Sequence, residues 1–223
     1  METVVLSLGG SLVAPNGVDV SFVKRFCAFL KKQTGYRFVI VIGGGKPARV
    51  YQDAARALGV KSNSDLDWVG IRATYLNAEL VRSHLGKLAH NAVVTDPTKS
   101  LSTKKQFVIA CGWKPGRSTD YVAVELAKTL GATRVINLSN VACVCDKDPK
   151  QHDGAKCLSH LTWREYLNLV GRKWTPGMNS PFDPVAAKAA QTGKLAVFIA
   201  DGSNLANLKK ILNGKPFAGT LIA

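Results

Sequence analysis

A buried strand that runs directly into a glycine turn and then into a helix is the feature that most constrains the fold of this chain. Residues 38–42 (FVIVI) are all bulky, and most are β-branched or aromatic, as is typical of a buried parallel strand. Three glycines follow at 43–45, and a helical pattern runs from 46 to 59. Its expected buried face consists of Val50, Ala54, Ala57 and Leu58. This arrangement is typical of an open α/β sheet.

The glycine turn is also a candidate site for an anionic group. Glycines have no Cβ to hold an anion away, and the N–H groups at the start of the following helix point outward. Lys46 and Arg49 add positive charge at the same place. Two further glycine turns follow predicted strands, at 9–11 (Gly-Gly-Ser) and at 111–120. Because ligands bind at the carboxyl ends of strands in such sheets, we expect the three turns to converge on one crevice.

The remaining patterns predict an alternation of strands and helices. Strands are expected at 3–8, 93–94, 107–111, 133–138 and 195–200, with a closing edge strand at 219–222 and one arm of a hairpin at 143–145. Helices are expected at 19–32, 68–86, 121–130, 162–170, 184–192 and 204–212, with caps at Asp19, at one of Ser118, Thr119 or Asp120, at Thr162 and at Asp183. Asp67 is expected at the start of the helix over 68–86.

Composition narrows the class of protein. The chain has 223 residues, 46% of them hydrophobic, which is enough for one large domain or two lobes with a sizeable core. No apolar run reaches the roughly 18 residues needed to cross a bilayer, and the N-terminus lacks a signal-peptide pattern, so we predict a cytoplasmic protein. Five cysteines without a secretion signal favour reduced thiols. The net charge of +15 favours phosphorylated ligands; a nucleic-acid partner is possible but not favoured, because the cations are dispersed.

Eight segments in order resemble the amino acid kinase superfamily and, within it, the archaeal-type uridylate (UMP) kinases. They are LGGSL at 8–12, VIGGGKPAR at 41–49, DWVGI at 67–71, GWKPGRSTDYVAVELA at 112–127, INLSNV at 136–141, DKDP at 146–149, DPVAAK at 183–188 and GTLI at 219–222. The resemblance implies a three-layer αβα sandwich around an open, mainly parallel sheet, forming one domain over 1–223. It implies an acceptor lobe at about 1–133, an ATP lobe at about 134–223 and a hexamer.

The reaction implied by the resemblance is transfer of the γ-phosphoryl group of ATP, with Mg²⁺, to UMP, giving UDP in pyrimidine nucleotide synthesis. Catalytic residues would be Gly10, Ser11 and Asp120, to which we add Lys46 as our own candidate cation, and no protein metal site is implied. ATP would contact Gly9, Gly10, Ser11, Gly45, Arg49, Ser139, Asn140, Cys145 and Asp148. UMP would contact Gly44, Asp67, Gly112, Trp113, Lys114, Pro115, Gly116, Arg117, Ser118 and Thr119.

The chain departs from the family pattern at two places that matter for chemistry. Many members carry a lysine two residues before the first glycine pair, where this chain has Ser7. We rank Lys46, Lys114 and Arg117, in that order, as the cation that takes its place. The family's Asp-Gly-Val-Tyr becomes Ala-Cys-Val-Cys at 142–145.

These departures leave three alternatives open. The acceptor could be carbamate, acetylglutamate or isopentenyl phosphate, or the chain could be a non-catalytic nucleotide or oxyanion binder or a nucleic-acid partner. A zinc site is the third alternative, from Cys143, Cys145, His152, Cys157 and His160. The sequence has no C-x-x-C pair here, and we expect Cys143 and Cys145 to point to opposite faces of a strand. The interpretation therefore favours buried thiols and loop histidines.

Overall fold

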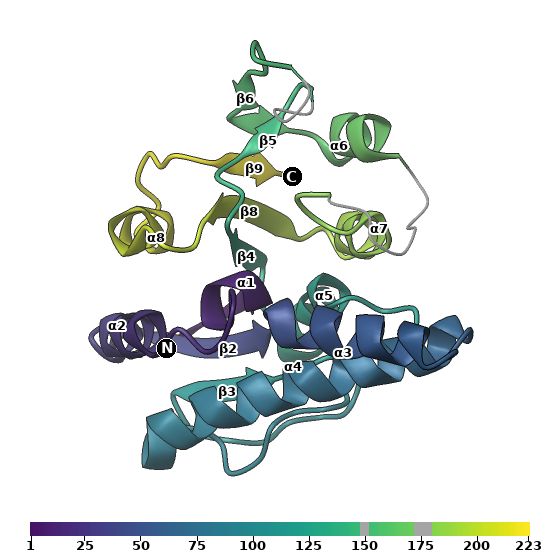
Figure 1. Cartoon of the computed structure of the whole chain (residues 1–223). Helices are drawn as coiled ribbons and strands as arrows, with labels where there is room; N and C mark the ends of the chain where they lie inside the picture. Colours follow the sequence, from purple (N-terminus) through teal and green to yellow (C-terminus); the bar gives the residue numbers. More distant parts are fainter. Residues whose placement is uncertain (148–151, 172–179) are drawn as a thin grey trace.

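The computed structural model describes residues 1–147, 152–171 and 180–223, and its centre is a seven-stranded sheet (Figure 1). The strand order is β3-β2-β1-β4-β8-β9-β7. All pairs from β3 to β8 are parallel, β9 runs antiparallel to β8, and β7 is parallel to β9. Their bounds are β1 Glu2–Leu8, β2 Tyr36–Ile42, β3 Phe107–Ala110, β4 Arg134–Ser139, β7 His160–Leu161, β8 Ala196–Asp201 and β9 Thr220–Ile222. A separate antiparallel hairpin is formed by β5 (Val144–Cys145) and β6 (Cys157–Leu158).

Helices cover both faces of the sheet, which confirms the predicted three-layer αβα sandwich (Figure 1). One face packs against α2 (Val20–Lys31), α4 (Asn63–Leu85) and α8 (Leu205–Leu212). The other packs against α5 (Thr119–Leu130), α6 (Trp163–Val170) and α7 (Pro184–Thr192). The remaining helices are α1 (Gly10–Val13), α3 (Gly45–Ala57) and a 3₁₀ turn at Gly86–Leu88.

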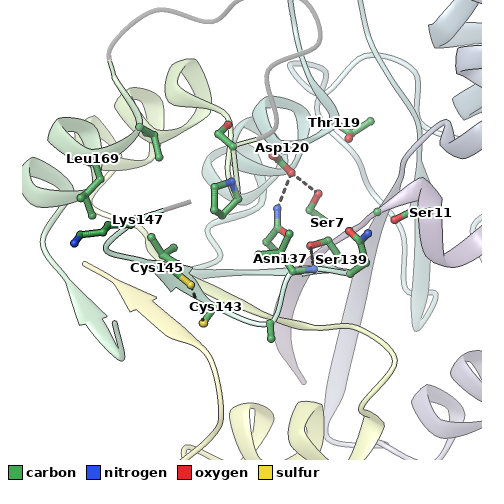
Figure 2. A pocket seen from close by; sticks show the side chains of 18 of the residues that line it. Ser7, Ser11, Thr119, Asp120, Asn137, Ser139, Cys143, Cys145, Lys147 and Leu169 are labelled. Atoms are coloured by element: carbon green, nitrogen blue, oxygen red, sulfur yellow. Dashed lines mark hydrogen bonds between the residues drawn. The ribbon is translucent and has the colours of Figure 1, made fainter. Parts of the chain in front are cut away.

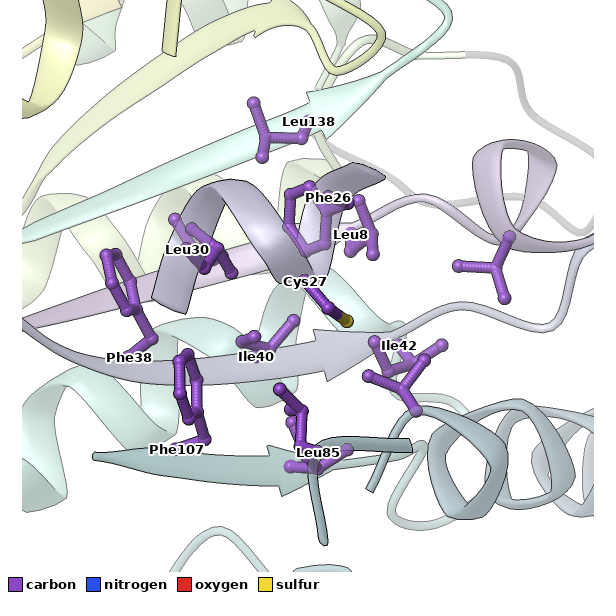
Figure 3. Packing of buried hydrophobic residues seen from close by; sticks show 14 of the residues in the cluster. Leu8, Phe26, Cys27, Leu30, Phe38, Ile40, Ile42, Leu85, Phe107 and Leu138 are labelled. Atoms are coloured by element: carbon purple, nitrogen blue, oxygen red, sulfur yellow. The ribbon is translucent and has the colours of Figure 1, made fainter. Parts of the chain in front are cut away.

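Alternation along the strands produces the two cores. Phe38, Ile40 and Ile42 of β2 face the first core, while Val39 and Val41 face the second. In the first core the Phe38 and Phe107 rings stack at 6.0 Å between centroids, below the side chains of α2 (Figure 3). Strands this apolar on both sides need helices on both faces, as observed.

The helix caps that the sequence predicts are present. Asp19 accepts a hydrogen bond from the Phe22 N–H, Ser118 caps α5, and Thr162 with Glu165 forms a complete capping box. Asp183 caps α7, with Pro184 at its first position. The N-termini of α5 and α7 lie near the carboxyl ends of β1 and β4, since Asp120 accepts hydrogen bonds from Ser7, Asn137 and the Asp183 N–H.

Four local predictions are wrong. The helix expected at 46–59 is α3, and its expected buried face is exposed. This helix has no buried residue, because it packs on α4 and not on the sheet. Helix α4 begins at Asn63 behind a Ser62 cap, so Asp67 lies in its second turn rather than at its start. The strand at 219–222 is not an edge, since β9 pairs with both β8 and β7. Val94 makes only an isolated bridge to Ala110, not a strand.

The prediction of reduced thiols is also wrong for two of the five cysteines. Cys143 and Cys157 form a disulfide, while Cys27, Cys111 and Cys145 are free. Among the described residues, no helix combines the length and apolar character required to span a bilayer.

Candidate functional site

The first two glycine turns pack backbone against backbone at the carboxyl ends of β1 and β2. A Cβ on Gly10 would lie 2.6 Å from the Gly43 carbonyl carbon and would also collide with the Gly45 nitrogen. Gly45 has φ of +64°, a conformation that favours glycine. The glycines are therefore required by the contact between the two turns, whatever ligand the turns bind.

Two polar residues of α4 hold the second and third glycine turns in place, and the sequence analysis singles out neither of them. Asn77, 3% exposed, donates from Nδ2 to the carbonyl oxygens of Gly43 at 2.9 Å and Gly44 at 3.1 Å. The Thr74 hydroxyl accepts a hydrogen bond from the Gly112 N–H at 2.7 Å. A buried amide or hydroxyl in a helix has no local sequence signal, because its partners are distant in the chain.

The third turn closes over the N-terminus of α5. The Asp67 carboxylate accepts a hydrogen bond from the Gly116 N–H at 2.8 Å, which ties this turn to α4. The Arg117 guanidinium lies 4.7 Å from the centre of the Tyr121 ring, and the Lys114 ammonium lies 3.9 Å from that of Trp113. The turn is thus positioned by one charged hydrogen bond and two cation–π contacts.

Two cavities open at this edge of the sheet. The larger, about 1100 Å³, is lined by β1, β4, the segment leading into the β5–β6 hairpin, and the end of α6 (Figure 2). The smaller, about 400 Å³, lies between α3, α4 and the third turn. Arg49 and Thr119 line both cavities. The two cavities therefore meet at the Arg49 side chain and at Thr119, the first residue of α5.

Asp120 is the centre of a hydrogen-bond network at the floor of the larger cavity (Figure 2). Its Oδ1 accepts from the Ser7 hydroxyl and from Asn137 Nδ2, each at 2.8 Å, and its Oδ2 accepts from the Asp183 N–H at 3.2 Å. The pKa of Asp120 is raised to about 6; burial is the main cause and the charge of Asp183 adds to it, while the hydrogen bonds from Ser7, Asn137 and the Asp183 N–H oppose the rise. Ser7, at the position of the family lysine, is thus a neutral partner of this carboxylate.

The residues expected to contact ATP and UMP divide between the cavities. Of the residues expected to contact ATP, six line the larger cavity, together with Asp120: Gly9, Ser11, Arg49, Ser139, Asn140 and Cys145. Of the residues expected to contact UMP, six line the smaller cavity, together with Gly45: Gly44, Asp67, Gly112, Arg117, Ser118 and Thr119.

Some expected site residues lie elsewhere. Gly10 is buried in the contact between turns. Lys46 is exposed and lines neither cavity. Four residues of the third turn also line neither cavity: Trp113, Lys114, Pro115 and Gly116. Trp113 packs against the second core. Asp148 lies outside the described residues.

The β5–β6 hairpin carries part of the wall of the larger cavity, since Cys143, Val144 and Cys145 line it. Thr220 of β9 joins this hairpin to the main sheet. Its hydroxyl accepts from the Val144 N–H at 2.8 Å and donates to the Leu158 carbonyl at 2.6 Å. One side chain therefore fixes both strands of the hairpin.

Comparison with known proteins places these features in a family. Residues 2–201 match the model of the amino acid kinase family. A uridylate kinase of Thermoplasma volcanium is 35% identical over 99% of this chain and 97% of its own length, and one of Methanoculleus marisnigri is 33% identical over 100% and 96%. A crystal structure of uridylate kinase from Archaeoglobus fulgidus superposes with a TM-score of 0.87 at 34% identity, covering 100% of both chains.

Proposed function

This chain belongs to the amino acid kinase family, and on that premise we propose that it is a nucleoside monophosphate kinase that transfers the γ-phosphoryl group of ATP to UMP. The full-length similarity to uridylate kinases supports the reaction. The observation that carries the proposal is the pair of cavities that meet at Arg49 and Thr119, because a kinase must bring a donor and an acceptor phosphate to one point.

ATP occupies the larger cavity and UMP the smaller one. The larger space is bounded by Ser11 on one side and by Ser139 and Asn140 on the other, which suits a triphosphate with its nucleoside. The smaller space has Arg117 and the N-terminus of α5, with its Ser118 cap, facing an acceptor phosphate. Helix α3 begins at the same place and adds a second N-terminus.

The reaction needs alignment and positive charge more than proton transfer. An oxygen of the UMP phosphate forms a bond to the γ-phosphorus as the bond from that phosphorus to the β–γ bridging oxygen breaks, and ADP leaves. A phosphate monoester is largely dianionic at neutral pH, since its second pKa is about 6. The attacking oxygen carries no proton, so no general base is required.

Arg49 is the cation that we assign to the transferring group. It projects from α3 where the cavities meet, whereas Lys46, ranked first from the sequence, lies outside both. A guanidinium offers several N–H donors to the equatorial oxygens. Arg117 lines only the smaller cavity and is assigned to UMP.

Magnesium fits this site as a companion of ATP. Mg²⁺ is usually held by one or two carboxylates together with substrate phosphates and water. Asp120 lines the larger cavity, and from the described part of the chain its Oδ2 accepts one hydrogen bond, so an acceptor position remains on that oxygen. Bound there, Mg²⁺ would neutralise charge on the phosphates.

We further propose that the chain forms a homo-oligomer, as the family resemblance implies with a hexamer. Helices α3 and α4 pack on each other and expose Val50, Tyr51, Trp68, Leu76 and Leu80, which are between 40% and 69% exposed. A cluster of exposed apolar side chains on one helix pair is typical of a protein interface. Light scattering of the purified chain tests this, and a monomer at micromolar concentration would contradict it.

The decisive experiment is an ADP-release assay with MgATP that compares UMP, CMP, dTMP, AMP and GMP with acetylglutamate, carbamate and isopentenyl phosphate. We expect turnover selective for UMP. Arg117→Ala should raise the KM for UMP or lower kcat, because it removes charge beside the acceptor phosphate. Turnover of a non-nucleotide acceptor would contradict the assignment of the smaller cavity, and absence of turnover in folded protein would favour a binding role.

A further inference from the structure

Three cysteine sulfurs meet at the β5–β6 hairpin, and the proposed kinase chemistry uses none of their reactivity. Cys145 and Cys157 are directly paired across the hairpin, and Cys143 lies two residues before Cys145. The three Sγ atoms all lie within 4.8 Å of one another. The expectation that Cys143 and Cys145 point to opposite faces is wrong, because residues two apart on an extended segment share a face.

One pair of these sulfurs, that of Cys143 and Cys145, has the spacing of two ligands on a single metal ion. A Zn–S bond is about 2.3 Å long, so two thiolates on a tetrahedral zinc are about 3.8 Å apart. The Cys143 and Cys145 Sγ atoms are 3.8 Å apart. Among the described residues, this is the group of three or more cysteine, histidine or carboxylate side chains that could hold a metal ion, and His152 and His160 are not part of it.

We propose that the thiol form of this cluster is a zinc site, in which the thiolates of Cys143, Cys145 and Cys157 bind one Zn²⁺ and leave a fourth position for water. Three thiolates favour a soft or borderline ion over Mg²⁺ or Ca²⁺. The disulfide between Cys143 and Cys157 is the oxidised, metal-free form of the same site. A dithiol reductant converts it to two thiols by supplying two electrons and two protons, and binding of Zn²⁺ then releases three protons.

The position of the cluster explains what the metal would stabilise. The hairpin has only two residues in each strand, and a two-stranded hairpin alone is marginally stable in water. Thr220 fixes its base, and two of the three cysteines, Cys143 and Cys145, line the larger cavity. A metal at this point would hold the cavity wall in one conformation without oxidation.

The exposure of Cys145 and Cys157 as whole residues argues against the simpler interpretation of buried thiols. Cys143 is buried, but Cys145 is half-buried and Cys157 is exposed. An inert core cysteine such as Cys27 is fully enclosed, and burial raises its pKa to about 11. A metal ion can therefore reach the cluster from solvent.

The test is metal binding by the full chain, reduced with a phosphine because thiol reductants would compete for the metal. Titration with Co²⁺ should give one bound ion per chain, with thiolate-to-cobalt charge-transfer absorption and the intense visible bands of tetrahedral cobalt, and Zn²⁺ should displace it. Cys145→Ser and Cys157→Ser should each weaken Co²⁺ binding by more than the roughly 10–100-fold that loss of an outer-shell partner costs. Cys27→Ala, in the first core, is the matched control and should leave the stoichiometry unchanged.

X-ray absorption of the zinc-loaded chain should show three sulfur neighbours at about 2.3 Å. The proposal is overturned if reduced wild-type protein binds no more Co²⁺ than a variant lacking all three thiols. It is also overturned if Cys145→Ser retains the wild-type cobalt spectrum, or if the oxidised protein binds the metal equally well. Circular dichroism of each variant establishes that it is folded, so a loss of binding can be assigned to the ligand.

Discussion

Asp120 should make the stability of this protein fall as the pH rises through the weakly acidic range. Its pKa is about 6 in the folded chain against an ordinary value of 3.8, mainly because burial disfavours the charged form. The folded state therefore binds this proton more tightly than the unfolded state does. The resulting contribution to the free energy of unfolding is fully present below about pH 4 and is lost as the pH rises through about 6.

The magnitude follows from the two pKa values. A rise from 3.8 to about 6 corresponds to about 3 kcal/mol, because each tenfold change in proton affinity is worth about 1.4 kcal/mol. Asp120 keeps some exposure to the larger cavity, and solvent there reduces the effect. We therefore expect about 2 kcal/mol.

The variant Asp120→Asn isolates this contribution. Its changed hydrogen bonds to Ser7, Asn137 and Asp183 add an offset that varies little with pH, so the informative quantity is the pH dependence of the difference between wild type and variant. Urea unfolding at several values between about pH 4 and 7 should show the wild type losing about 2 kcal/mol relative to the variant as the pH rises.

A matched control is Asp53→Asn, on the exposed side of α3, where the carboxylate pairs with Arg56 at the surface. Such pairs are worth about 0–1 kcal/mol, so its difference from wild type should change little across the same range. A flat difference for Asp120→Asn, or one in which the wild type gains relative stability with rising pH, would refute the reasoning.

Three further predictions concern the glycine turns and the meeting point of the cavities. Arg49→Ala should lower kcat/KM by about 100-fold to 1000-fold in the ADP-release assay, because it removes a hydrogen-bond donor to the transferring phosphoryl group. The control Arg56→Ala, on the same helix, should have little effect, and equal losses in the two variants would contradict the assignment of Arg49. Gly10→Ala should lower the melting temperature markedly, since its Cβ would collide with backbone, while Gly17→Ala, with nothing within 4 Å, should not; a wild-type melting temperature for the first variant would show that the turns can separate. Asn77→Leu removes the side-chain donor to the Gly43 carbonyl oxygen and leaves that of Gly44 with only the long hydrogen bond from the Ala48 N–H, so it should cost about 1–3 kcal/mol in urea unfolding, and a neutral result would mean that water replaces the amide.

Local signals allowed much of the fold to be predicted. The capping box of Thr162, the Asp183-Pro184 start of α7 and the glycine stop after α5 depend on residues within four positions of one another. The apolar runs at β1, β2 and β4 identified the central strands for the same reason.

Features that depend on the neighbours of an element were not predictable in this way. The periodicity of α3 indicates that one face is apolar, but not that Val50 and Leu58 remain outside this chain's core. The alternation in β9 likewise could not indicate that β7, from an earlier part of the chain, lies beyond it.

The candidate site shows the same division. Residues in the glycine turns could be identified by composition, whereas the partners of Asp120 could not. Ser7 and Asp120 are 113 positions apart, and their hydrogen bond depends on the pairing of β1 with β4 beside α5. The sequence analysis ranks Lys46 first, but it is Arg49, three residues later on the same helix, that lines both cavities.

The place of β9 in the sheet determines the order in which the chain can assemble during synthesis. Strands β1 to β4 can pair as soon as residue 139 is available. By contrast, β7 is made some 60 residues before β9, and among the described strands its one partner in the sheet is β9, which lies between it and β8. Thr220, which holds both strands of the hairpin, belongs to that same late strand. A ribosome-bound nascent chain that ends before residue 220 would therefore have the acceptor side formed and the wall of the larger cavity still unanchored.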